Sequence, residues 1–253
     1  MQLNPGKKIY FLSDFHLGAP DHTSSLKREK RIVQFLDEIK HEAAIIFIVG
    51  DLFDFWYEYK KVVPKGFVRI LGKLADLTDS GIEIKFFVGN HDMWMNGYFE
   101  KELNIEVFHE PQEFQFNDKT FLIGHGDGLG PGDCRYKFIK KVFRSKISQG
   151  LFGMLHPSLG IGLANYFSRK SRAATGKQDA QFLGEEKEWL IIYCKEILKQ
   201  KHFDFFIFGH RHLPIEYKLG DKSVYVNLGD WINYFSYAVF DGDNLSLKYY
   251  EHE

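Results

Sequence analysis

The sequence predicts an α/β fold in which two β-sheets pack as a sandwich and helices cover its outer faces. In residues 8–88, short apolar runs alternate with segments of helical periodicity, the order that gives parallel strands covered by helices. After residue 105, the pattern changes to short strand-like runs separated by turn residues. We expect a single domain over residues 1–253, a length sufficient for a substantial core.

The first 88 residues contain three expected strands and two expected helices. The strands are apolar almost throughout, as are strands buried on both faces of a sheet. The first helix carries apolar residues at helical spacing, among them Ile32 and Phe35, and the second stops before Gly81. In chain order, these elements are a strand at 8–13, a helix at 26–40, a strand at 44–49, a helix at 67–77 and a strand at 82–88.

The other expected strands are short and lie on both sides of an insertion. Turn sequences such as Asn117-Asp118 and Asp221-Lys222 separate neighbouring runs and favour hairpins. These strands are expected at 105–108, 113–116, 120–124, 205–208, 215–219, 223–227, 237–240 and 245–250.

The inserted segment, at about 131–180, differs from the rest of the chain in charge. Residues 134–178 hold ten Lys or Arg and no Asp or Glu, although the net charge of the whole chain is −1. Apolar residues interrupted by Gly and Pro predict short helices there. We interpret this segment as a binding surface, and the alternative interpretation is an ordinary solvated helical pair. The basic residues are Arg135, Lys137, Lys140, Lys141, Arg144, Lys146, Arg169, Lys170, Arg172 and Lys177.

Composition argues against several classes of protein. A net charge of −1 does not fit a chain that binds polyanions by bulk charge. Cys134 and Cys194 lie far apart without a CxxC pattern, which favours a reducing compartment. The N-terminal apolar run is too short for a signal peptide, and no segment approaches the ~20 apolar residues that span a bilayer. We therefore expect a cytoplasmic protein that can still lie on a membrane.

Five expected strands run into side chains of the kind that bind metal ions. In open α/β sheets, the crevice at the carboxyl ends of the strands is the usual ligand site. Glycines precede four of these donors and let the backbone turn tightly beside an ion. The donors are Asp14 and His16 after the strand at 8–13, Asp51 after 44–49, Asn90 after 82–88, His125 after 120–124, and His210 and His212 after 205–208.

This set of donors indicates two metal ions. Oxygen and imidazole donors without a thiolate suit Mn, Fe, Zn or Mg. Seven donors are too many for one ion but suit two that share a carboxylate. Two ions ~3.5–4 Å apart can bind a phosphoryl oxygen and generate hydroxide between them. Each motif alone is more often a turn or polar packing, but their order at five strand ends favours the metal site.

In this order, the motifs D-x-H, G-D-x-x-D, G-N-H-D, G-H and G-H-x-H resemble the signature of the calcineurin-like metallophosphoesterases, over residues 8–230. The resemblance implies the αββα sandwich of that family and two divalent metal ions. It also implies that His91 lies near the substrate phosphate without binding metal, is held by Asp92, and acts as a general acid or charge stabiliser. The implied ligands are Asp14, His16, Asp51 and His212 for one ion, and Asp51, Asn90, His125 and His210 for the other.

Further motifs resemble the bacterial UDP-2,3-diacylglucosamine diphosphatases of lipid A biosynthesis. They are S-D-F-H-L-G at 13–18, G-D-L-F-D-F-W at 50–56 and H-G-D-G-L at 125–129. The resemblance implies a helical cap over acyl chains and attack of metal-activated water on the α-phosphorus, which releases UMP and 2,3-diacylglucosamine 1-phosphate. It also implies Mn²⁺ ahead of Fe, Zn or Mg, a lipid-linked nucleotide-sugar substrate, and peripheral contact of a cytoplasmic protein with the anionic inner membrane. The implied substrate-binding residues are Asn90, His91, Asp133, Tyr136, Arg169, Lys170, Arg172 and Lys177.

One departure leaves the substrate open. Many members of that subfamily have Arg where this chain has His91. The chain is therefore either a divergent branch with the same reaction or an enzyme for another phosphodiester or pyrophosphate. A nuclease on the same metal site is one alternative, because basic patches with aromatics bind nucleic acid, although an aliphatic and Gly-rich patch suits lipid better. A non-enzymatic scaffold would require lost ligands, and all seven are present.

Overall fold

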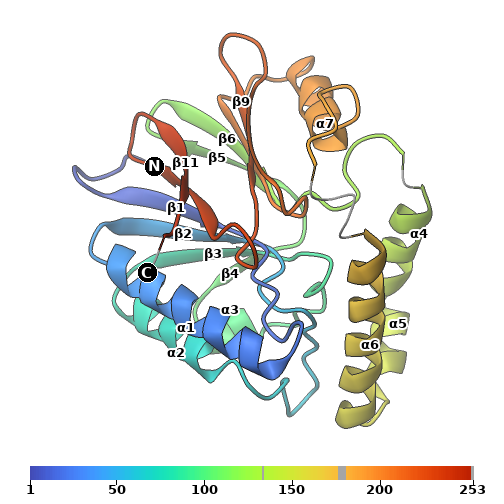
Figure 1. Cartoon of the computed structure of the whole chain (residues 1–253). Coiled ribbons are helices and arrows are strands. Elements are labelled where there is room, and N and C mark those ends of the chain that lie inside the picture. The colour runs from blue at the N-terminus through green and yellow to red at the C-terminus, as the bar shows by residue number, and fades with distance from the viewer. Residues whose placement is uncertain (133, 176–180, 252–253) are drawn as a thin grey trace.

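Two mixed β-sheets pack face to face in the computed structural model, which describes residues 1–132, 134–175 and 181–251 (Figure 1). The strands are β1 (Lys8–Leu12), β2 (Ala43–Val49), β3 (Glu83–Phe87), β4 (Glu106–Phe108), β5 (Gln112–Phe116), β6 (Lys119–Gly124), β7 (Phe205–Phe208), β8 (Pro214–Lys218), β9 (Val224–Leu228), β10 (Ser236–Phe240) and β11 (Leu245–Tyr249). The six-stranded sheet has the order β11-β10-β1-β2-β3-β4, and the five-stranded sheet has the order β5-β6-β7-β9-β8. The α/β sandwich expected from the sequence is confirmed.

Parallel pairing brings the strand ends that carry the polar motifs to one edge of the sandwich. In the first sheet, β1 pairs parallel with β2, and β2 pairs parallel with β3. In the second sheet, β6 pairs parallel with β7. The residues that follow these five strands therefore leave their sheets in a common direction, which is the arrangement needed to gather side chains from distant parts of the sequence.

Aromatic side chains fill the space between the two sheets. The ring of Phe11 on β1 stacks on that of Phe47 on β2 at 5.1 Å between centroids, and on that of Phe121 on β6 at 6.1 Å. All three side chains are buried. This inner core accounts for part of the high Phe content of the chain, because each ring removes a large apolar area from water.

Three helices cover the outer faces of the sandwich (Figure 1). The helices α1 (His22–Ile39) and α2 (Val68–Asp79) pack on the first sheet, where Ile32, Phe35 and Leu74 belong to one buried cluster with residues of β1–β3. The helix α7 (Trp189–Leu198) packs on the second sheet through Leu190 and Ile191. The sequence predicts α1 and α2, but it does not predict α7 or the short helix α3 (Tyr98–Glu102).

Three further helices, α4 (Cys134–Phe143), α5 (Lys146–Gly153) and α6 (Pro157–Thr175), form the helical insertion. They stand together beside the sandwich (Figure 1). Hydrogen bonds join them to it, and two of these come from aromatic side chains: the Trp94 indole donates to the carbonyl oxygen of Phe143 at 2.8 Å, and the Tyr57 hydroxyl donates to that of Gln149 at 2.7 Å. The helices expected between strands are therefore present, and α6 is longer than expected, with 19 residues. Within the described residues, no helix has both the length and the apolarity needed to cross a membrane.

Candidate metal centre

The seven donors that the sequence predicts lie together at the edge of the sandwich. Ligand atoms form three groups, and the atoms of each group lie within 4.8 Å of one another. The groups are Asp14, His16 and His212; His16, Asp51 and His91; and Asp51, His125 and His210. The strand ends of both sheets contribute, so the site lies where the two sheets meet.

The first cluster consists of Asp14, His16 and His212. The Nε2 atoms of His16 and His212 lie 3.1 Å apart. The Oδ1 atom of Asp14 lies 3.6 Å from the first of these nitrogens and 3.3 Å from the second. Two imidazole nitrogens and a carboxylate oxygen that face a common point are a donor set for a divalent cation.

The second cluster contains Asp51, His125 and His210, and its Asp51 also approaches His16 of the first cluster. The Oδ2 atom of Asp51 lies 3.4 Å from Nε2 of His125 and 3.6 Å from Nε2 of His16. The Asn90 amide oxygen lies 3.1 Å from Nε2 of His125, and His210 belongs to the same group of ligand atoms. Asp51 therefore stands between the two clusters, as a bridging carboxylate requires.

Buried polar atoms without hydrogen-bond partners show that the site fits cations. Among the described side chains, these atoms include Oδ1 of Asp14 and Oδ2 of Asp51. A buried carboxylate oxygen without a partner is costly, and buried charges in proteins are usually paired or bind metals. Both atoms face the histidine nitrogens of their clusters, so two divalent cations would satisfy them.

The electrostatics of the cluster lead to the same conclusion. Burial alone would lower the pKa of His16 and of His125, but the neighbouring Asp14, Asp54 and Asp51 carboxylates outweigh burial and raise each pKa to about 10. Burial, with the charge of His125 added, lowers the pKa of His210 to about 4. The carboxylates thus favour positive charge in the site, and bound metal ions would supply that charge in place of the protons.

The backbone at the donors is strained. Asp14, His16, Asp51, His210 and His212 have φ of 56°, 44°, 54°, 65° and 53°. They are five of the nine described non-glycine residues with positive φ. Such conformations cost about 1–3 kcal/mol each and gather at functional sites. The fold therefore holds these side chains in directions that a relaxed backbone would not give.

Glycines allow the loops to approach one another closely, as the sequence predicts. A methyl group at Gly50 would collide with the ring of His125, and one at Gly209 would collide with the hydroxyl of Ser13. A methyl group at Gly89 would collide with the carboxylate of Asp51. Only a residue without a side chain lets these backbones pack directly against the donors.

The structure places His91 at the site but does not place Asp92 as its support. His91 Nδ1 lies 3.0 Å from the carbonyl oxygen of Asp54 and 3.2 Å from the hydroxyl oxygen of Ser168 on α6. Burial lowers the pKa of His91. Among the described residues, no hydrogen bond joins the side chains of Asp92 and His91. The expectation that Asp92 holds His91 is therefore wrong.

Asp92 instead organises the backbone around Asp51. Its carboxylate accepts hydrogen bonds from the amides of Gly89 at 2.7 Å and Leu52 at 2.8 Å. Burial and the nearby Asp51 carboxylate raise the pKa of Asp92 to about 7. Through these hydrogen bonds the fully buried Asp92 side chain joins the loop after β2 to the loop after β3. It thereby fixes two donor loops relative to each other.

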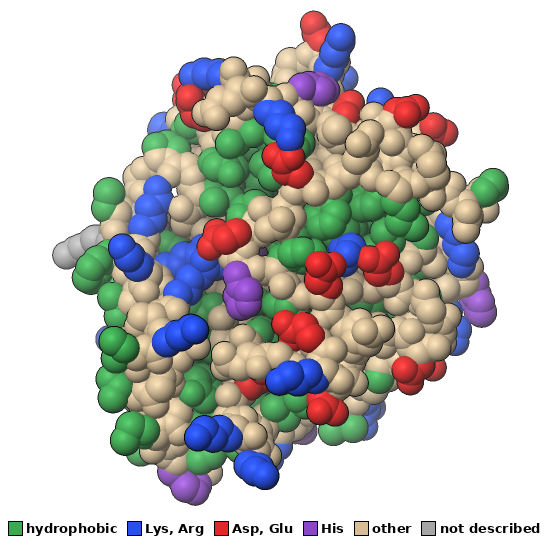
Figure 2. Space-filling model, turned by 180° about the vertical axis from the view of Figure 1, so that it is seen from behind, with side chains coloured by type: hydrophobic (Ala, Val, Ile, Leu, Met, Phe, Trp, Pro, Cys, Tyr) green, Lys and Arg blue, Asp and Glu red, His purple; other side chains and the backbone are tan. Residues whose placement is uncertain are grey.

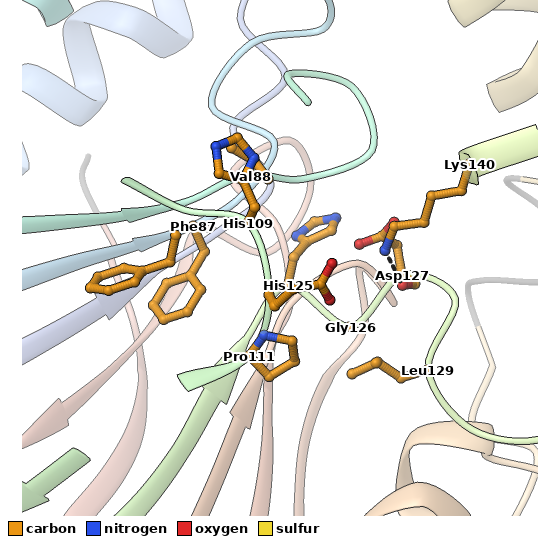
Figure 3. A pocket seen from close by; sticks show the side chains of 11 residues that line it. Phe87, Val88, His109, Pro111, His125, Gly126, Asp127, Leu129 and Lys140 are labelled. Carbon is orange, nitrogen blue, oxygen red and sulfur yellow. Dashed lines mark hydrogen bonds and ion pairs between the residues drawn. The ribbon is translucent and has the colours of Figure 1, made fainter. Parts of the chain in front are cut away.

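Two acids that the sequence analysis did not name as site residues lie beside the donors. Asp230 Oδ2 lies 3.3 Å from Nδ1 of His212. Asp127 accepts a hydrogen bond from the Tyr136 hydroxyl at 2.7 Å and pairs with Lys140 at 2.7 Å. Figure 3 shows this ion pair beside His125, at a small pocket of about 10 Å³. Asp230 repeats the pattern of a glycine followed by a donor at a strand end, a signal in the sequence that could have revealed it.

A cavity of about 470 Å³ opens next to the donors. The sandwich supplies one wall and the helical insertion the other, and most of the lining is apolar. Its lining residues are Asp54, Phe55, Trp56, Asn90, His91, Met93, Trp94, Tyr136, Ile139, Lys140, Phe143, Phe152, Leu163, Ala164, Phe167 and Ser168.

The structure describes the positions of only some of the candidate substrate-binding residues. Asn90, His91 and Tyr136 line the cavity. Lys170 is exposed on α6. Two other candidates, Asp133 and Lys177, lie outside the described residues, and so do the side chains of Arg169 and Arg172.

A two-sheet sandwich with clustered Asp and His side chains at its strand ends is the architecture of a metal-dependent phosphoesterase. The family model for calcineurin-like phosphoesterase matches residues 7–214, and the chain belongs to that family. It is 41% identical to UDP-2,3-diacylglucosamine hydrolase of Porphyromonas gingivalis, over 95% of this chain and 97% of that protein. It is 27% identical to the enzyme of the same name from Histophilus somni, over 89% of this chain and 92% of that protein.

Among solved structures, a phosphoesterase from E. coli is similar with a TM-score of 0.45 and 16% identity, over 94% of this chain and 91% of that chain. The family assignment rests on the sequence matches. Both resemblances noted in the sequence are thereby confirmed, and the protein is a hydrolase that depends on divalent metal ions.

Proposed function

We propose that the protein hydrolyses the pyrophosphate of UDP-2,3-diacylglucosamine to UMP and 2,3-diacylglucosamine 1-phosphate. The observation that carries this proposal is the apolar cavity of about 470 Å³ that opens directly at Asn90 and His91. A substrate with a pyrophosphate and two acyl chains needs apolar walls beside a site that binds phosphate. The name of the relative with 41% identity supports the same substrate.

The proposed ligands of one ion are Asp14, His16, Asp51 and His212, and those of the other are Asp51, Asn90, His125 and His210. When bound, two such ions polarise the phosphoryl group and activate water at neutral pH. We propose Mn²⁺ as the native metal, ahead of Fe, Zn and Mg. The ring of His125 has a partner at the nitrogen that is not a proposed ligand atom. The carbonyl oxygen of Val49 lies 2.8 Å from Nδ1 of His125. A partner of this kind sets the tautomer that leaves Nε2 free for a metal.

His91 is the proposed general acid or charge stabiliser. Its Nδ1 lies close to the Asp54 carbonyl and the Ser168 hydroxyl, which fixes the plane of the ring. A phosphate bound beside the ring raises its affinity for a proton. Ser168 belongs to α6, so the helical insertion helps to orient a residue at the phosphate. We propose that the insertion acts as a cap of a single domain, and that Asp92 supports the reaction through the backbone of the donor loops.

A product assay tests the substrate. Metal-loaded protein in detergent is expected to release UMP from UDP-2,3-diacylglucosamine, with kcat/KM at least about 100-fold higher than for the same nucleotide sugar without acyl chains. Burying about four methylene groups accounts for this ratio, at ~0.8 kcal/mol each. Absence of UMP would sink the proposed substrate. Processive cleavage of single-stranded DNA at moderate salt would instead favour a nuclease.

We also propose that the helical insertion contacts an anionic membrane surface from the cytoplasmic side. Figure 2 shows hydrophobic and basic side chains side by side along the left edge of the molecule, where the insertion lies in that view. Ile147, Leu151 and Met154 are 77%, 62% and 81% exposed. Exposed apolar groups among Lys and Arg are typical of surfaces that bind anionic lipid.

Replacing Ile147, Leu151 and Met154 together by Ser is expected to lower the partition coefficient for phosphatidylglycerol vesicles by about tenfold or more. The reason is that three apolar side chains no longer enter the lipid. Cosedimentation measures the effect, and hydrolysis of bis-p-nitrophenyl phosphate should stay at the parental rate. Val68→Ser is the matched control, because Val68 is 73% exposed on α2 and is not part of the insertion. Parental binding by the triple variant would disprove the contact.

A further inference from the structure

A buried ion pair stands behind the loop that carries His210 and His212. The Arg211 side chain between these histidines is 1% exposed, and its partner Glu188 is 2% exposed. Nε of Arg211 donates to Oε2 of Glu188 at 3.1 Å, and Nη2 donates to Oε1 at 3.1 Å. The two parallel hydrogen bonds fix both the distance and the plane of the guanidinium.

The loop that this pair anchors serves both metal clusters. His212 belongs to the cluster with Asp14, and His210 belongs to the cluster with Asp51. Both histidines have left-handed backbone, and the amide of Arg211 donates to the carbonyl oxygen of Gly209 at 2.7 Å. A strained three-residue turn persists only when its surroundings hold it. The Arg211 side chain is the contact at the centre of this turn, while Asp14 accepts from the amide of His210 and Asp230 contacts the ring of His212.

The Glu188 carboxylate contacts Arg211 and does not cap the helix that follows it. Glu188 is the N-cap residue of α7, yet its side chain makes no capping hydrogen bond to that helix. Its Oε1 atom accepts instead from the amide of Leu183 at 3.0 Å and from Arg211. Negative charge near a helix N-terminus is favourable through the helix dipole. The Glu188 carboxylate is used to hold the loop instead.

The pair also ties the metal loop to the chain that returns from the helical insertion. Nη2 of Arg211 donates to the carbonyl oxygen of Gln181 at 2.6 Å. The guanidinium lies over the Trp189 ring at 5.6 Å, and that ring lies 6.4 Å from the ring of His210. Segment 181–189 and loop 209–212 therefore form one packed unit next to the second cluster.

We propose that Glu188 and Arg211 are positioning residues that set the directions of His210 and His212, one in each metal cluster. This inference rests on the proposed function of these histidines as metal ligands. Stability alone gives a poor reason for the pair, because replacing a buried ion pair by apolar residues is often neutral or stabilising. The orientation that this ion pair imposes on His210 and His212 explains its presence without any gain in stability.

The double variant Glu188→Leu/Arg211→Met tests the proposal because it leaves no uncompensated buried charge. We expect it to unfold thermally at or above the parental temperature. Its affinity for Mn²⁺ in calorimetric titration should fall by about 10–100-fold, the usual effect of losing groups that orient metal ligands. For bis-p-nitrophenyl phosphate at saturating Mn²⁺, kcat should fall while KM stays unchanged.

Two further variants guard against loss of the fold. Arg211→Lys keeps the charge but loses the paired hydrogen bonds, so its Mn²⁺ affinity should lie between those of the parent and the double variant. Glu196→Gln is the matched control, because it breaks an exposed ion pair with Lys199 at the other end of α7 and should change nothing. Parental Mn²⁺ affinity in both Arg211 variants would overturn the inference. The titration contains no lipid substrate, so failure of UMP release would affect only the proposed substrate.

Discussion

Replacing Asp51 by Ala is expected to lower the hydrolysis of bis-p-nitrophenyl phosphate by at least about 10³-fold, or ~4 kcal/mol of activation free energy. The reason is its position, since Oδ2 lies between His16 and His125, and Oδ1 accepts the amide hydrogen of His91 at 2.8 Å. Initial rates and metal content by mass spectrometry measure the effect, and both should fall together.

Two variants sharpen that test. Asp51→Asn keeps an acceptor for the amide of His91 and so separates loss of the bridging charge from loss of the fold. Asp221→Ala removes a carboxylate from an exposed turn and should leave both rate and metal content unchanged. An Asp51→Ala protein that retains both metal ions and a rate near the parental one would refute the bridging role.

Replacing His91 by Ala is expected to lower kcat by about 10²–10⁴-fold, the usual contribution of a general acid or base. Metal content should stay at the parental level, since neither proposed set of ligands includes His91. His22→Ala, at the exposed start of α1, is the control for loss of an imidazole away from the site.

The alternative for His91 has a clear signature. One ring nitrogen of His91 lies within 4.8 Å of ligand atoms of His16 and Asp51, so the geometry also allows His91 to bind a metal. If His91→Ala loses metal in proportion to activity, His91 is a ligand, and its role at the phosphate is wrong.

Local sequence patterns predicted much of the fold because its strands are strongly apolar and its turns are polar. They missed α7, in which Leu190, Ile191 and Ile192 follow one another and give no helical stripe. They also gave no strand order. The pairing of β1 with β10 depends on residues more than two hundred positions apart, as Ile9 opposite Phe240 shows, and no local periodicity encodes it.

The donors could be predicted because each one follows its strand directly, so the sheet topology alone gathers them. Their supports could not be predicted in the same way. Asp92 lies next to His91 in sequence, but its side chain turns to the backbone of Gly89 and Leu52. Asp127 and Glu188 act through contacts with other segments, with Lys140 and Arg211 respectively. Such contacts exist only in the folded molecule.

The place of β1 in the middle of its sheet has a consequence for biosynthesis. One edge of β1 pairs with β2, but its other edge pairs with β10, and the carbonyl of Asp14 accepts the amide hydrogen of Trp231 at 3.2 Å. A ribosome releases the N-terminal part first, at about 5–20 residues per second. We therefore expect the nascent chain to carry an unpaired, apolar β1 edge until residues 236–240 emerge, and to need protection by chaperones for that interval.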